Sequence, residues 1–333
     1  MIFARSMKFT KSQAVFINFN FIVIAILLCL SAFSQIGYAQ DDVIRVDTEL
    51  VIVPATVLDR EGRYVTNLRK EDFQIFENGV EQEITIFEPI EKPFTILFLL
   101  DTSGSMNNKM AHLARAANAF VNQLRPNDQI IVALFDDWVD VLSEVKSIKD
   151  FRENKTFRLR TKGSAPITMV YDAVDYALKK MKKIRGRKAI VLFSDGVGSG
   201  YSATVKSNLR DAEESEALIY TVQFNTYPKI APPYVNKKQY YENIDIANNY
   251  LQNLAQKTSG RHYQIEDVSN LEKTFGMVAE ELSRQYSLGY YPEQLEAGQK
   301  RQTRQIKVKM RQLNLVVRAR SSYVIEPQKK TKQ

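Results

Sequence analysis

The sequence predicts an α/β fold in which a doubly wound, mostly parallel sheet is inserted into a small β-sandwich formed by both flanks of the chain. Between Phe94 and Tyr286, short apolar runs typical of buried strands alternate with helical patterns, as in a sheet covered on both faces. The flanks, residues 46–87 and 286–324, carry strand patterns alone. Each flank is too small to bury a core by itself, so we expect the two to pair.

Strands and helices follow one another through the central region. The expected strands are residues 94–100, 129–135, 139–145, 189–193 and 217–223, of which 139–145 is a short antiparallel edge strand. Apolar residues at helical spacing predict helices over residues 110–124, 170–181, from 204 onward, 247–254 and 271–282. This alternation is typical of parallel strands joined by helical crossovers.

The flanks show strand and hairpin patterns. The N-terminal flank has strand-like runs at residues 46–58, 73–76 and 82–87, with the turn Asn78-Gly79 between the last two. The C-terminal flank has such runs at residues 286–290, 303–310 and 315–324. In the run 303–310, apolar residues alternate with basic ones, so this strand is expected to have one apolar and one basic face.

The first residues predict a secretory signal. Three basic residues precede an apolar run over residues 21–33, no acidic residue occurs before Asp41, and the small residues around Ala39 offer a cleavage site. We therefore expect an exported protein, periplasmic or extracellular, and a segment kept as a membrane anchor is the alternative. The only cysteine, Cys29, lies in this segment, so the mature chain is expected to lack disulfides, thiol catalysis and cysteine-bound zinc.

These patterns divide the chain into five segments. They are a signal peptide (1–39), an N-terminal β flank (40–91), the α/β domain (92–285), a C-terminal β flank (286–326) and a basic tail (327–333). The formal net charge of +8 falls to +5 when the three basic residues of the signal are removed. The mature chain is thus only mildly basic.

The first strand of the central region ends in a polar loop. Asp101, Ser103 and Ser105 stand two residues apart, directly after the apolar run 94–100. Open α/β sheets place their ligand sites at the carboxyl ends of parallel strands, where this loop is expected to lie. One carboxylate and two hydroxyls there offer hard oxygen ligands of the kind that a divalent cation takes.

Two further loops offer oxygen donors. The run 189–193 ends in Ser194-Asp195-Gly196, which places a second carboxylate at a strand end, and Thr168 stands just before a helical pattern. Any one of these loops, taken alone, is also explained by residues that cap helix N-termini without a metal. The three together, in this order, favour a metal site.

The three loops resemble the metal-ion-dependent adhesion site of von Willebrand factor type A domains. The residues that carry the resemblance are Asp101-x-Ser103-x-Ser105, Thr168 and Asp195. The resemblance implies a Rossmann-like von Willebrand factor A fold that binds Mg²⁺, or else Mn²⁺ or Ca²⁺. It also implies that the two serines bind the ion directly. The threonine corresponds to that of the second loop, and the two aspartates would bind the ion directly or through water. A partner's carboxylate would fill the open coordination position. The layout of nearly the whole mature chain resembles secreted bacterial proteins known as VWFA-related.

The sequence favours a non-enzymatic binding module, exported from a Gram-negative-type bacterium, that holds an acidic group of a protein or surface polymer through the metal. Metal-assisted hydrolysis by Asp101 and Asp195 is a weaker alternative, because His112 and His262 are the only histidines and neither stands in a nucleophile or zinc pattern. Binding of an anionic envelope polymer by the basic face of the terminal strands is another alternative. Nucleic acid is not expected, because that face lacks interleaved aromatic residues.

Residues 224–243 form an unusual connection after the strand 217–223. They hold three prolines and four tyrosines without a clear period. Connections of this length are commonly functional or disordered. Two interpretations stay open: the segment shapes the binding surface at the metal end of the sheet, or it is a surface loop whose tyrosines pack back on the domain.

Overall fold

The computed structural model describes residues 50–88, 92–154, 159, 168–295, 299–325 and 327. The chain divides into two units, Met1–Asp47 and Thr48–Gln333, and every described residue lies in the second. The expected signal segment 1–39 and the tail beyond Pro327 lie outside the described residues. None of the helices in the described part is long and apolar enough to cross a membrane.

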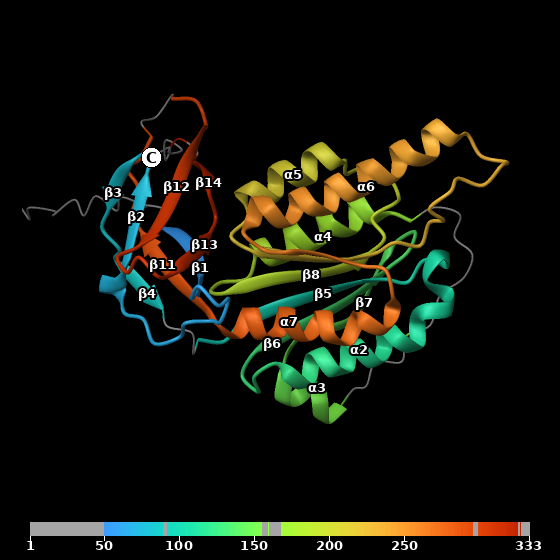
Figure 1. The fold of residues 1–333 in the computed structure, drawn as a ribbon, viewed down its shortest axis with the longest axis horizontal. Coiled ribbons are helices and arrows are strands. Elements are labelled where there is room, and N and C mark those ends of the chain that lie inside the picture. Colours follow the sequence, from blue (N-terminus) through green and yellow to red (C-terminus); the bar gives the residue numbers. More distant parts are fainter. Residues whose placement is uncertain are drawn as a thin grey trace, which may run out of the picture. The chain divides into compact units, whose positions relative to one another are not determined.

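The second unit contains a central sheet of mostly parallel strands (Figure 1). Its strands, in spatial order, are β10 (His262–Ile265), β9 (Leu218–Phe224), β8 (Lys188–Ser194), β5 (Thr95–Asp101), β6 (Gln129–Phe135) and β7 (Val139–Ser147). Only β7 runs antiparallel to its neighbour, at the edge. Every residue of β5, β8 and β9 is buried, as expected for strands covered on both faces.

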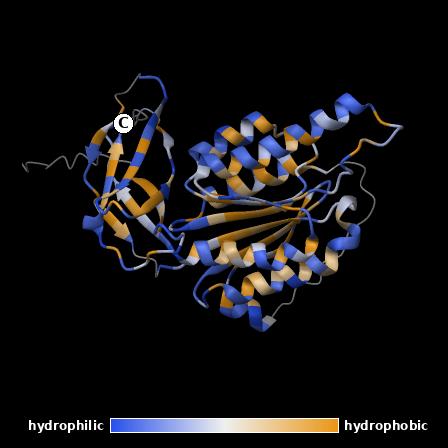
Figure 2. Cartoon of the chain, viewed as in Figure 1, coloured by the Kyte–Doolittle hydropathy of each residue, from blue (hydrophilic) through white to orange (hydrophobic). Residues whose placement is uncertain are grey.

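Helices cover both faces of this sheet (Figure 1). One face carries α2 (Met110–Gln123), α3 (Ile148–Asn154) and α7 (Leu271–Ser283), and the other carries α4 (Val170–Lys182), α5 (Val205–Glu214) and α6 (Lys237–Thr258). Successive β5 side chains alternate between the two cores, Phe98 toward α2 and α7 and Leu99 toward α4 and α6. Figure 2 shows the apolar strands between amphipathic helices.

The flanks form a two-layered β-sandwich. One sheet has the order β13 (Val316–Ala319), β1 (Val51–Leu58), β11 (Gln285–Tyr290), β4 (Ile86–Glu88), and the other has the order β14 (Ser322–Ile325), β12 (Gln302–Met310), β2 (Phe73–Glu77), β3 (Val80–Gln82). Each sheet combines strands from both flanks, and both sheets contribute to one apolar core. The predicted fold class is therefore confirmed, while the residue boundaries between segments stay predictions.

A buried polar cluster joins the flanks inside the sandwich. The Glu77 carboxylate of β2 forms an ion pair with Arg304 of β12, at 2.6 Å between Oε1 and Nη1. The hydroxyls of Tyr290 and Tyr323 each donate to its other oxygen at 2.7 Å. Both charged side chains are less than a tenth exposed. Since Glu77 comes from the N-terminal flank and its three partners from the C-terminal one, the cluster links the two flanks.

Several elements differ from the sequence prediction. Helix α6 begins at Lys237, inside the segment expected to be irregular, because the Asn236 side chain caps it by accepting a hydrogen bond from the Gln239 N–H at 3.1 Å. The run 315–324 is divided between β13 and β14, which belong to different sheets. Helix α3 and strand β10 were not expected, since each is too short to show a clear period.

Candidate metal centre

The two aspartates of the predicted site end neighbouring strands. Asp101 is the last residue of β5, and Asp195 directly follows β8, which pairs with β5 in parallel. Both side chains therefore lie at the same edge of the sheet. Asp101 is 0% exposed and Asp195 is 3% exposed, so the carboxylates are held out of bulk water.

The loop after β5 donates a hydrogen bond back to the carboxylate of Asp101, the last residue of that strand. One Asp101 oxygen accepts a hydrogen bond from the Ser103 N–H at 2.9 Å, and the other accepts one from the Ser194 hydroxyl at 2.7 Å. The Ser103 and Ser105 hydroxyl oxygens lie 3.1 Å apart. Ser103 is buried whereas Ser105 is exposed, so this group of oxygens reaches from the interior to the surface.

Asp195 is held by groups from its own loop, from β9 and from the loop after β9. Its carboxylate accepts hydrogen bonds from the Val197 N–H at 3.0 Å and from the Thr226 hydroxyl at 2.7 Å. The Gln223 side chain donates to the Asp195 backbone carbonyl at 3.0 Å. The carboxylate is thus fixed in place at the end of the strand.

The buried carboxylates of Asp101 and Asp195 lack enough positive charge nearby to balance their own. Burial, and next the charge of Asp195, raise the pKa of Asp101 to about 7. Burial likewise raises the pKa of Asp195. Four groups act against this rise, in decreasing order of effect: the Thr226 hydroxyl, the Val197 N–H, the Ser105 hydroxyl and the charge of Lys109. The Lys109 ammonium itself donates to the Ser105 carbonyl at 3.0 Å. A divalent cation would supply the missing charge, so the donor set fits one.

Thr168 reaches this edge through its backbone. Its carbonyl accepts a hydrogen bond from the Ser199 N–H, four residues after Asp195, at 2.9 Å. A Cβ added to Gly198 would lie 2.3 Å from the same carbonyl oxygen, so only glycine lets these loops approach so closely. The structure thus places Thr168 beside the loop that follows Asp195, and the role of its hydroxyl as a ligand stays a prediction.

All five predicted residues therefore lie at one edge of the sheet, in loops tied together by hydrogen bonds. Among the described residues, no three His, Cys, Asp or Glu side chains form a group that could hold a metal ion. A cation at this edge would rely on serine and threonine oxygens as well as the two carboxylates.

Comparison with known proteins assigns the domain. The family model described as the von Willebrand factor type A domain matches residues 96–197, a stretch that includes all five residues. Residues 96–197 are similar to von Willebrand factor type A domains. No curated protein matches the chain.

Several solved structures are similar to the chain at low sequence identity. A von Willebrand factor type A protein from Catenulispora acidiphila is 12% identical over 78% of this chain and 74% of its own, with a TM-score of 0.47. The ArnB paralog VWA2 from Sulfolobus acidocaldarius is 18% identical over 84% and 76%, with a TM-score of 0.42. Proximal thread matrix protein 1 from the mussel byssus, in a structure whose adhesion-site motif is occupied by zinc, is 15% identical over 62% and 49%, with a TM-score of 0.44.

Some residues that support the candidate metal centre were not identified from sequence. Ser194 and Thr226 each donate a hydrogen bond to one of the two carboxylates. Ser194 could have been found, because it ends a strand beside Asp195. Nothing in the sequence around Thr226 indicates a contact with Asp195, since Thr226 lies in the loop after β9 and reaches Asp195 only in the folded domain.

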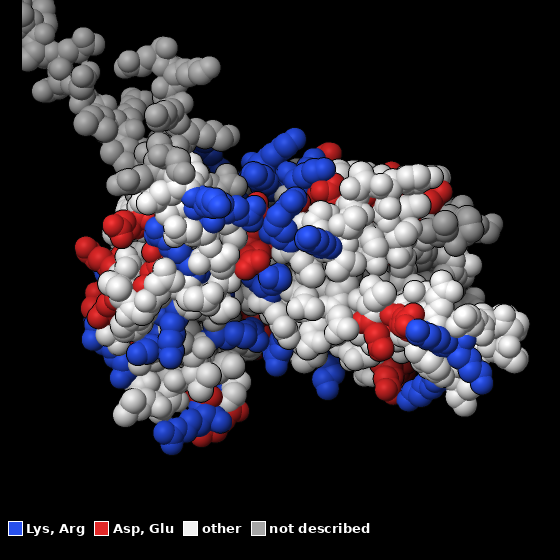
Figure 3. All heavy atoms as spheres, turned by 90° about the horizontal axis from the view of Figure 1, so that it is seen from above, with Lys and Arg blue, Asp and Glu red and all other residues white. Residues whose placement is uncertain are grey.

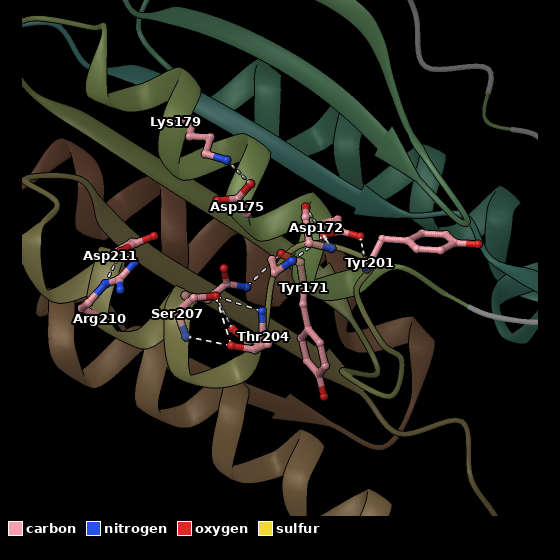
Figure 4. Close-up of polar contacts among 12 residues, drawn as sticks. Tyr171, Asp172, Asp175, Lys179, Tyr201, Thr204, Ser207, Arg210 and Asp211 are labelled. Atoms are coloured by element: carbon pink, nitrogen blue, oxygen red, sulfur yellow. Dashed lines mark hydrogen bonds and ion pairs between the residues drawn. The ribbon is translucent and has the colours of Figure 1, made fainter.

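Asp172, in the first turn of α4, anchors the loop that follows Asp195 (Figure 4). Its carboxylate accepts hydrogen bonds from the N–H groups of Tyr201, Ser202 and Ala203 at 2.6, 3.0 and 2.9 Å, and from the Ser202 hydroxyl at 3.0 Å. Partial burial raises its pKa, but these donors lower it on balance. Their stabilising contribution is therefore present above the ordinary pKa of 3.8 and is lost as the pH falls below it.

Proposed function

We propose that this chain is an exported, non-enzymatic binding module that holds an acidic group of a protein or surface polymer through a divalent cation. The observation that carries the proposal is the pair of buried carboxylates, Asp101 and Asp195, beside the hydroxyls of Ser103 and Ser105. The match of residues 96–197 to the von Willebrand factor type A domain supports it, since such domains commonly serve adhesion or metal-dependent binding.

The donor set favours a hard cation, Mg²⁺ first and Mn²⁺ or Ca²⁺ next, because every proposed ligand atom is an oxygen. We assign Asp101, Ser103, Ser105, Thr168 and Asp195 as the groups that hold it, directly or through water. Two carboxylates balance the charge of a divalent ion, so the ion, when bound, supplies an electrophilic position for one further oxygen ligand. The exposed Ser105 marks the side from which a partner would approach.

A binding role agrees with the placement of the two histidines. His112 lies on α2 with its Nδ1 3.0 Å from the Arg115 side chain, and His262 lies on β10 with its Nδ1 2.9 Å from the Thr221 hydroxyl. Both rings contact groups other than the predicted metal ligands. A general base for hydrolysis must lie within reach of the reacting group, so these contacts favour binding over catalysis.

A second candidate, binding of an anionic envelope polymer, rests on the outer face of β12. Lys307 and Lys309 are exposed there, and the Lys309 ammonium lies 4.4 Å from the centre of the Phe76 ring. Figure 3 shows Lys and Arg side chains gathered over the sandwich. This candidate and the metal-dependent one predict opposite responses to salt and chelator.

We expect the purified full chain, immobilised on a sensor, to retain acidic material from a bacterial envelope extract when Mg²⁺ is present and to release it into EDTA. Because the contact is short and partly desolvated, retention should change little between about 50 mM and about 200 mM salt. Asp195→Ala is the matched control and should retain nothing above background. Retention that survives EDTA but falls steeply with salt would contradict the metal-dependent function in favour of the basic face.

A further inference from the structure

Four large apolar or aromatic side chains are exposed in loops that follow the parallel strands of the central sheet. Trp138 after β6 is 56% exposed, Tyr201 after β8 is 90% exposed, and Ile230 and Tyr234 after β9 are 80% and 86% exposed. Loops that follow parallel strands open at one edge, which here is the edge of Asp101 and Asp195. We call these four side chains the apolar rim.

The rim lies on both sides of the carboxylates. The sheet order β9-β8-β5-β6 puts the loops after β8 and β9 on one side of β5 and the turn after β6 on the other. The β9 loop contacts the site directly, because the Thr226 hydroxyl bonds to Asp195. The turn after β6 contacts it through Asp136, whose carbonyl accepts from the Met169 N–H, beside Thr168, at 2.7 Å.

Polar contacts hold the rim loops in place. The N–H groups of Tyr201 and its two successors bond to Asp172, and Figure 4 shows the Tyr201 ring directed away from α4 and α5. In the β9 loop, the Tyr240 hydroxyl donates to the Pro228 carbonyl at 2.6 Å, and the Tyr241 hydroxyl accepts from the Ala231 N–H at 3.2 Å. An aromatic side chain on a fixed loop loses little conformational entropy on binding, as in the anchors of protein interfaces.

Charge distinguishes the kinds of partner that this edge could accept. The stretches 196–205 and 225–236, which carry Tyr201, Ile230 and Tyr234, contain a single charged residue, Lys229. Lys109 lies beside Ser105, and two aspartates, Asp136 and Asp137, precede Trp138. A polymer with many negative charges would need several cations along its path, which these stretches do not offer. A single acidic group at the centre, with apolar surface around it, is the complementary arrangement.

We propose that the partner is a protein whose binding segment presents one acidic side chain flanked by apolar or aromatic ones, with the acidic group at the metal and its neighbours on the rim. The inference rests on the function proposed above. It assigns specificity to Tyr201, Tyr234, Ile230 and Trp138, which hold no metal. Substitutions in the rim should therefore weaken binding of the partner without changing binding of the metal.

Two immobilised peptides test this on the full chain with Mg²⁺ present. One carries a single Asp between Leu and Tyr residues, and the other carries the same Asp between Ser and Gly residues. We expect the apolar peptide to bind at least about tenfold more tightly, and Tyr201→Ser together with Tyr234→Ser to remove that preference. Mn²⁺ binding by the double variant should stay unchanged. Tyr291→Ser, at a tyrosine of the C-terminal flank that is 50% exposed, is the matched control and should behave as wild type.

The outcomes separate this inference from the proposed function. Equal, chelator-sensitive binding of both peptides, or a preference that survives the double variant, would overturn the inference alone. Binding of a uronic-acid polysaccharide but of neither peptide would also overturn it, as would a self-association that the double variant abolishes. Peptide binding that persists in EDTA would contradict the proposed function itself.

Discussion

Replacing Glu77 with glutamine should lower the free energy of unfolding by about 3–5 kcal/mol, because it removes one partner of a buried ion pair. The Arg304 guanidinium would keep its charge inside the sandwich, and the two tyrosine hydroxyls would lose a charged acceptor. Urea unfolding of the wild type and the variant measures the difference. The effect is large because this one side chain connects strands from both flanks.

Glu81→Gln is the control for this variant. Glu81 lies on β3 of the same sheet but is exposed, and its contacts are a hydrogen bond from Gln74 at 2.9 Å and an Arg311 side chain at 4.0 Å. Its substitution should cost no more than about 0.5 kcal/mol. If Glu77→Gln is as mild as Glu81→Gln, the buried cluster does not hold the flanks together.

Asp101→Asn should abolish the stabilisation that Mg²⁺ gives the wild type. A ligand at about a hundred times its dissociation constant stabilises a protein by about 2.7 kcal/mol, and this gain requires both carboxylates. The metal-free variant should be at least as stable as the metal-free wild type, because one of two mutually repelling buried charges is gone. Asparagine keeps the oxygen that accepts from the Ser103 N–H, so the loop is retained.

Thermal unfolding with and without Mg²⁺ measures this effect. The wild type should unfold at a higher temperature with the ion, and Asp101→Asn should not respond. Thr168→Ala should respond to an intermediate degree, because water can replace a neutral ligand. An equal rise in the unfolding temperature of wild type and Asp101→Asn would show that Mg²⁺ acts elsewhere on the chain.

Much of the central sheet could be predicted because its strands are almost wholly apolar. Strands β5 and β8 are buried on both faces, so their sequences contain continuous apolar runs, and the polar residues at their ends stand out. This contrast makes Asp101 and Asp195 recognisable in the sequence. The short β10 and the first turns of α6 could not be found in this way, since β10 has only four residues and α6 begins with polar ones.

The supporting contacts could not be predicted, because they join residues that are distant in sequence. Thr226 reaches Asp195 across 31 positions, and Ser194 reaches Asp101 across 93. Glu77 meets Arg304 across 227 positions, and nothing near either residue indicates the other. Pairing of the flanks could be expected from their size alone, but the buried cluster that links them depends on the register of the strands.

Direct titration with Mn²⁺, followed by the loss of the free-ion signal in electron paramagnetic resonance, tests whether Asp101 and Asp195 hold a divalent cation. We expect one saturable site per wild-type chain, displacement of the bound Mn²⁺ by Mg²⁺, and no such site in Asp195→Asn. An absence of saturable binding in the wild type, or equal binding in wild type and Asp195→Asn, would contradict this expectation.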